Sequence, residues 1–208
     1  MSVLHVVQED SLYPSTLKQY LGENAPERIA AIGNVDILKY KKLAFFCSVK
    51  CPGNLIIQAL DLAQALRKVG ITVIGGFHSP VEREILKTLL RSPHPVIICP
   101  ARNIDRMRFP KEYKKPLSEN RLLFLSPFNE KHRRITVETS NIRNEFVAAI
   151  AEKVFVAYAA PESKTMQFCK EVLAKGKLLS TLKNVDTSGL IKLGAKPIQT
   201  TNVKKLFL

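Results

Sequence analysis

The sequence predicts an α/β protein with an open, mostly parallel sheet and helices on both faces. Short apolar and β-branched runs alternate with segments whose apolar residues recur at helical spacing, as in residues 71–74 followed by residues 80–90. The run 43–47 is apolar throughout, which is typical of a strand buried on both faces. The 208 residues are enough for one large domain with a substantial core.

The N-terminal segment differs from the rest of the chain. A turn and a helix-cap signal precede Leu17, Tyr20 and Leu21, which share one helical face, and Gly33-Asn34 is typical of a turn. We therefore expect a small helical or irregular lead-in over residues 1–40. The main domain is expected to occupy residues 41–208.

The main domain begins with a β-turn-α-β unit of the size of a right-handed crossover. It comprises a strand at 43–47, a helix at 54–69 that Gly70 ends, and a strand at 71–74. The alternation then continues to the end of the chain. We expect helices at 80–90, 141–152, 165–175 and 188–193, strands at 95–99, 122–125, 154–158 and 178–182, and an irregular basic stretch at 100–120 with Pro110 and Pro116.

The charge is strongly basic, with 32 Lys and Arg against 18 Asp and Glu, a net charge of +14. Such an excess favours a polyanionic partner, although a cationic surface that binds nothing is the alternative. Residues 102–134 carry ten basic and four acidic residues, and residues 164–208 carry nine and two. The sequence does not show whether these two basic blocks share a face.

The cysteines and the apolar runs limit the class of protein. Cys47, Cys51, Cys99 and Cys169 lack the second Cys or His pair of a zinc site, so we expect no metal. The sequence shows neither a signal peptide nor an apolar run long enough to span a bilayer. We expect a cytoplasmic protein that does not bind membranes.

Candidate binding residues follow the predicted strands, because open parallel sheets bind ligands beyond the carboxyl ends of their strands. A helix N-terminus there offers free N–H groups to an anion. Each feature also has a structural reading: Ser79 and Glu82 form a capping box, His78 is a polar turn residue, and Ser163 and Thr165 are caps. The candidates are Ser48 and Lys50 after the first strand, Gly75, Gly76, Phe77 and His78 after the second, and Ser163, Lys164 and Thr165 after the strand at 154–158.

Arg143 and Asn144 open the predicted helix at 141–152. A basic residue at a helix N-terminus opposes the helix dipole, and this favours an Arg143 that faces an anion.

Catalytic motifs are not visible in the sequence. It contains no dinucleotide fingerprint, no P-loop, no nucleophile elbow and no Ser/His/Asp order. We predict no catalytic residues and no cofactor, and the sequence favours a protein that is not an enzyme.

Taken in order, these turns resemble the DNA-processing protein A family (DprA, also called Smf) over nearly the whole sequence. The family's first-strand Gly-Ser/Thr-Arg is represented by Cys47-Ser48-Val49, with Lys50 following, and its acidic Asp by Glu82. We expect a divergent, trimmed member without the winged-helix tail. The family's Tyr-Pro-x-x-Leu, Leu-x-x-x-Gly-Asn, Ser-Gly-x-Ala-x-Gly-Ile-Asp, Arg-Asn and Ser-Gly-Ser-x-x-Thr segments are similar to residues 13–17, 29–34, 75–82, 143–144 and 162–165.

The resemblance implies a Rossmann-like domain over residues 41–208, a homodimer, and binding of single-stranded DNA. It also implies a non-catalytic role in DNA processing and recombination, in which a RecA-type recombinase is loaded onto DNA taken up in transformation. A small-nucleotide-binding sensor or hydrolase, and a structural interaction module, remain alternatives. The expected DNA or phosphate contacts are Ser48, Lys50, Gly75, Gly76, Phe77, His78, Arg143, Asn144, Ser163, Lys164 and Thr165.

Overall fold

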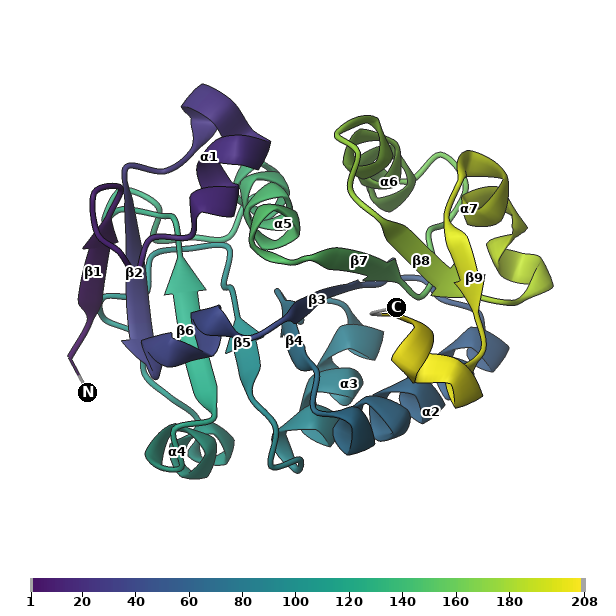
Figure 1. Ribbon diagram of the computed structural model, residues 1–208, viewed down its shortest axis with the longest axis horizontal. Coiled ribbons are helices and arrows are strands. Elements are labelled where there is room, and N and C mark those ends of the chain that lie inside the picture. Colours follow the sequence, from purple (N-terminus) through teal and green to yellow (C-terminus); the bar gives the residue numbers. More distant parts are fainter. Residues whose placement is uncertain (1, 207–208) are drawn as a thin grey trace.

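The computed structural model describes residues 2–206, and its strands form one sheet (Figure 1). They are β1 (Leu4–Val7), β2 (Arg28–Gly33), β3 (Lys42–Phe46), β4 (Thr72–Gly75), β5 (Val96–Ile98), β6 (Leu122–Ser126), β7 (Lys153–Val156), β8 (Leu179–Leu182) and β9 (Lys196–Ile198). Their order is β1-β2-β6-β5-β4-β3-β7-β8-β9. Only the pairs β1–β2 and β2–β6 are antiparallel in this sheet. The predicted open, mostly parallel sheet is confirmed.

Helices cover both faces of the sheet, as predicted (Figure 1). The α-helices are α1 (Ser15–Leu21), α2 (Gly53–Val69), α3 (Pro80–Leu90), α4 (Lys111–Ser118), α5 (Val137–Ile150), α6 (Lys164–Ala174) and α7 (Ser188–Leu193). The described residues also contain four 3-10 helices, which are η1 (Gly22–Asn24), η2 (Val35–Lys39), η3 (Val185–Thr187) and η4 (Thr200–Leu206). Helices α2, α3, α4 and η4 pack on one face, and α1, α5, α6 and α7 pack on the other.

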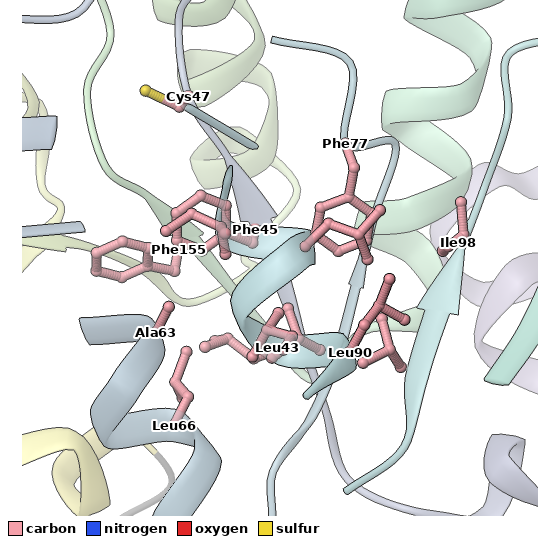
Figure 2. Close-up of a cluster of buried hydrophobic side chains, with 14 of the residues drawn as sticks. Leu43, Phe45, Cys47, Ala63, Leu66, Phe77, Leu90, Ile98 and Phe155 are labelled. Carbon is pink, nitrogen blue, oxygen red and sulfur yellow. The ribbon is translucent and has the colours of Figure 1, made fainter. Parts of the chain in front are cut away.

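The two hydrophobic cores follow from the alternation of side chains along the strands. In β3, Leu43 and Phe45 point toward α2 and α3, whereas Ala44 and Phe46 point toward α5 and α6. Figure 2 shows Phe45 packed beside Phe155 of β7, with 5.5 Å between the ring centroids. Because both faces of β3 are buried, its apolar sequence needs no alternation.

The topology reverses between β3 and β7. From β3 the chain passes to β4, β5 and β6 on one side, and it then returns to pair β7 with the other side of β3. The segments that follow β3 and β7 lead into α2 and α6, which lie on opposite faces of the sheet. Such a reversal is a topological switch point, and open α/β sheets bind their ligands beyond the carboxyl ends of the strands there.

The N-terminal segment is more regular than we predicted. Residues 1–40 were expected to be helical or irregular, but β1 and β2 lie there, and β2 pairs with β6 in the main sheet. The apolar core of β2 is only four residues long and buried on both faces, so it shows no strand periodicity. The division of the chain into a lead-in and a main domain near residue 40 stays a prediction. Residues 1, 207 and 208, which belong to these two predicted segments, lie outside the described residues.

Three further elements depart from the prediction. Residues 100–120 were expected to be irregular, but α4 forms there with Pro116 inside it. A short helix tolerates proline at this position because only one intrahelical hydrogen bond is lost. Strand β9 and helix η4 were also missed, since residues 195–206 carry little periodic apolar signal.

Candidate functional site

The predicted site residues gather at one edge of the sheet. Parallel strands end at the same edge, so the loops after β3, β4 and β7 lie next to each other there. We call this the carboxyl edge. It brings together Ser48 and Lys50, the turn 75–79, and residues 163–165, as the sequence analysis expected.

Glu82 ties the loop after β3 to the turn after β4. Its buried carboxylate accepts hydrogen bonds from the backbone N–H groups of Cys47 (2.9 Å), His78 (2.8 Å) and Ser79 (3.3 Å). The Ser79 hydroxyl accepts the N–H of Glu82 in return, so the predicted capping box is confirmed. The protein's own carboxylate therefore occupies the N-terminus of α3, one of the helix N-termini at which the sequence analysis expected an anion to bind.

Ser48 ties the loop after β3 to the loop after β7. Its N–H donates to the carbonyl of Tyr158 (2.9 Å), and its hydroxyl accepts the N–H of Ala160 (3.2 Å). The side chain of Ser48 is only 6% exposed. These two hydrogen bonds thus join the loops after β3 and β7, and the Ser48 hydroxyl accepts one of them.

Arg143 does not lie at a helix N-terminus. Helix α5 begins at Val137, where Thr136 accepts the N–H of Thr139 in a capping box, and Arg143 falls in the second turn. The expected start at residue 141 was wrong because the cap lies in a polar stretch without apolar periodicity. The argument that Arg143 opposes the helix dipole therefore no longer applies.

Arg143 instead lies across the turn after β4. An ideal Cβ on Gly76 would be 1.0 Å from Nη1 of Arg143, so the side chain passes where another residue would place its own. Nη1 donates to the carbonyl of Cys99 (3.3 Å), and Nε donates to Oδ1 of Asn144 (2.8 Å). Burial lowers the pKa of the Arg143 guanidinium, and the Glu82 carboxylate opposes that shift. Gly76 thus makes room for a buried arginine.

The residues on either side of Gly76 also face inward. The ring of Phe77 is 5% exposed and packs in the core near Phe45 (Figure 2). Its φ of 50° is unusual for a residue other than glycine, and burial of the ring offsets the strain. A Cβ on Gly75 would approach the carbonyl of Phe45 at 3.1 Å. The side chain of Phe77 therefore lies in the core and not toward a ligand.

The exposed members of the predicted set are Lys50, His78 and Lys164. Ser163 is half-buried and accepts the N–H of Met166 (3.1 Å), which confirms that it caps α6. Thr165 and Asn144 are half-buried. Lys50 therefore supplies positive charge to the loop after β3, and Lys164 supplies it to the start of α6.

A basic cluster at the same edge was missed as a site. Six of the ten basic residues of block 102–134 lie in the loops after β5 and β6, whereas the rest lie on α4 or beside the amino end of β6 (Figure 1). The charge count indicated that residues 102–134 are strongly basic, but the sequence did not show which of the basic residues reach the carboxyl edge. The six residues are Arg102, Arg106, Arg108, Lys131, Arg133 and Arg134.

Comparisons with known proteins agree with this geometry. The family model described as DNA recombination-mediator protein A matches residues 4–206. A search of curated proteins finds no match. None of the helices within residues 2–206 has the length and apolar character needed to cross a membrane.

Solved structures show the same fold. DNA processing protein A (DprA) from Streptococcus pneumoniae superposes with a TM-score of 0.81 at 20% identity, over 99% of this chain and 74% of that one. DNA processing protein A from Helicobacter pylori, whose structure concerns its single-stranded DNA binding mode, gives 0.78 at 18% identity, over 97% and 95%. The molybdenum cofactor carrier protein from Chlamydomonas reinhardtii gives 0.53 at 14% identity, over 80% and 98%.

Proposed function

The chain belongs to the DNA recombination-mediator protein A family, and from this premise we propose that it binds single-stranded DNA at the carboxyl edge of its sheet. In this role the protein acts in DNA processing and recombination without catalysing a reaction. The observation that carries the proposal is the pair of exposed lysines beyond the carboxyl ends of the neighbouring strands β3 and β7, with Lys50 in the loop after β3 and Lys164 at the start of α6. A strand lying across these two loops would meet positive charge from both.

The predicted site residues divide into two groups by the role that we propose for them. Lys50, His78 and Lys164 are proposed to contact the strand directly, with the backbone of Gly75, Gly76 and Phe77 and the hydroxyls of Ser163 and Thr165 beside them. Ser48, Arg143 and Asn144 are proposed as positioning residues, because their polar atoms already bond within the protein. Binding of this kind is electrostatic and reads little base sequence.

The experiment is a fluorescence-anisotropy titration of a labelled dT20 oligonucleotide over a salt series. We expect log K to fall linearly with log salt, with a slope of about 0.7 for each phosphate contact. The double variant Lys50→Ala/Lys164→Ala should bind more weakly and lose about 1.4 from that slope. The matched control is Lys68→Ala/Lys87→Ala, which removes two exposed lysines from α2 and α3.

Two outcomes would count against the proposal. Wild-type protein that does not bind dT20 at low salt contradicts it outright. Thermal stabilisation by a mononucleotide, without any by dT20, would support the small-nucleotide alternative instead.

We also propose that the protein works in the cytoplasm as a homodimer and passes its strand to a RecA-type recombinase. The homodimer and the recombinase partner are what the family resemblance implies. Light scattering coupled to size-exclusion chromatography tests the dimer. Co-elution with a recombinase in the presence and absence of dT20 tests the partner, and a monomer that never co-elutes would contradict both statements.

A further inference from the structure

The loops after β5 and β6 enclose a basic groove that none of the predicted site residues line. We call it the β5–β6 groove, and it is a hollow of about 580 Å³. Its charged lining residues are Arg102, Asp105, Arg106, Arg108, Glu130 and Arg133. Four guanidinium groups against two carboxylates leave it net positive.

Asn103 and Ser126 hold the two loops of the groove together. Asn103 donates from its side chain to the carbonyl of Phe128 (3.1 Å) and from its backbone to the carbonyl of His132 (2.8 Å). The hydroxyl of Ser126 donates to the carbonyl of Arg102 (2.8 Å). These bonds join one loop to the other. Nε of Arg133 also donates to the carbonyl of Glu130 (3.2 Å) within its own loop, which leaves the two terminal nitrogens of its guanidinium for a ligand.

The arginines of the groove are exposed and make no ion pair. Within residues 2–206, no carboxylate lies within 4.0 Å of the guanidinium nitrogens of Arg102, Arg106, Arg108 or Arg133. The Asp105 carboxylate accepts the side-chain N–H of Asn103 (3.1 Å) and lies 3.7 Å from Nε2 of His5 on β1. A guanidinium fork matches the oxygens of a phosphate, so unpaired arginines on a fixed frame suit a phosphate ligand.

A second hollow of about 310 Å³ adjoins the groove. Lys131, His132 and Arg134 line it, and Arg133 lines both hollows. Two basic hollows that share a wall residue suit a polymer that passes over Arg133 better than one compact anion.

The groove, Lys50 and Lys164 lie at the same edge of the sheet, because β3, β4, β5, β6 and β7 are parallel. Four strand spacings separate β6 from β7, which is about 19 Å. Resting on the proposed function, we propose that the β5–β6 groove is a second segment of the single-stranded DNA path, where arginines bind phosphates beyond those held by Lys50 and Lys164. The strand then runs along the carboxyl edge from β7 to β6.

The test compares two double variants with wild-type protein by anisotropy with dT20 over a salt series. Arg106→Ala/Arg133→Ala should weaken binding and reduce the salt slope by about 1.4, as two lost phosphate contacts require. Arg91→Ala/Lys114→Ala removes the same charge from exposed positions at the end of α3 and on α4, and it should bind as wild type does. Circular dichroism melts confirm that both variants are folded.

Three results would overturn the inference while leaving the proposed function intact. The first is binding of dT20 by Arg106→Ala/Arg133→Ala that matches wild type while Lys50→Ala/Lys164→Ala binds weakly. The second is that Arg106→Ala/Arg133→Ala loses as much affinity for a 20-base-pair duplex as it loses for dT20. That result would make the groove a duplex site. The third is thermal stabilisation by pyrophosphate that only the arginine variant loses, together with unchanged dT20 binding. If wild type binds no dT20, the proposed function fails and the inference fails with it.

Discussion

The guanidinium of Arg143 lies where the side chain of residue 76 would begin. A Cβ built on Gly76 would be 1.0 Å from Nη1, well inside any real contact. The φ of Gly76 is not in the left-handed region, so its backbone would accept another residue if the arginine were absent. The glycine at this position is thus required by the arginine and not by the backbone conformation.

We expect Gly76→Ala to destabilise the protein by about 2 kcal/mol, because Arg143 must leave the carbonyl of Cys99 and its charge remains near the core. In an Arg143→Ala background the same change should cost much less, with a coupling of about 1–2 kcal/mol. Urea unfolding measures both values. Gly53→Ala is the control, since nothing lies within 4 Å of a Cβ there. Equal costs in the two backgrounds would show that Arg143 does not occupy this space.

We expect Glu82→Gln to destabilise the protein by about 2 kcal/mol, because three backbone N–H groups bond to the carboxylate and an amide offers only one oxygen. Glu84→Gln is the control on the same helix. Glu84 is exposed and pairs only with Lys87 (2.7 Å), so its loss should cost less than about 1 kcal/mol. Similar urea midpoints for the two variants would contradict the bridging role of Glu82.

Cys51 should be the most reactive thiol of the native protein. A hydrogen bond from Cys47 lowers the pKa of Cys51, whereas burial raises the pKa of Cys99 and raises that of Cys169 to about 12. The pKa of Cys47 is raised by its bond to Cys51 and by burial.

Iodoacetamide should therefore modify Cys51 first, with a rate that reaches half its maximum below pH 9.0 because the thiolate forms earlier than in an ordinary thiol. Mass spectrometry of the native protein locates the label. In Cys47→Ala the half-maximal rate should move to higher pH, since the stabilising hydrogen bond is lost. Early labelling at Cys99 or Cys169 would contradict the burial of those thiols.

Thr136→Ala should cost about 1 kcal/mol of stability, because it removes the side-chain acceptor that caps α5. Ser15→Ala is the control: Ser15 is exposed at the start of α1, where no side-chain cap bond forms. Thermal unfolding compares the two. An unchanged melting temperature for Thr136→Ala would suggest that α5 begins later and that Arg143 is nearer its first turn.

The elements with strong local signals could be predicted from the sequence. The β-branched and apolar runs predicted β3, β4 and β6, and Ser79 with Pro80 predicted the first residue of α3. Gly70 marked the end of α2, where it adopts a positive φ. In each case a few adjacent residues determine the structure.

Features that depend on contacts between distant segments could not be predicted. Strand β2 is stabilised by pairing with β6, and its four buried residues carry no pattern of their own. The turn after β4 was correctly placed at the carboxyl edge, but the role of Gly76 depends on Arg143, which folding alone brings to it. The charge of block 102–134 was evident, whereas its division between two edges of the sheet required the fold.

Hydrogen bonds link the loops of the carboxyl edge from one strand to the next before any ligand arrives. Ser48 joins the loops after β7 and β3, Glu82 joins those after β3 and β4, and the N–H of Cys99 donates to the carbonyl of Gly75 (2.8 Å). A strand that docks on this edge meets a surface that needs little ordering, so the entropy lost on binding falls mainly on the flexible DNA. The rate of association is then set by diffusion and by the attraction of the basic loops, and not by a conformational change in the protein.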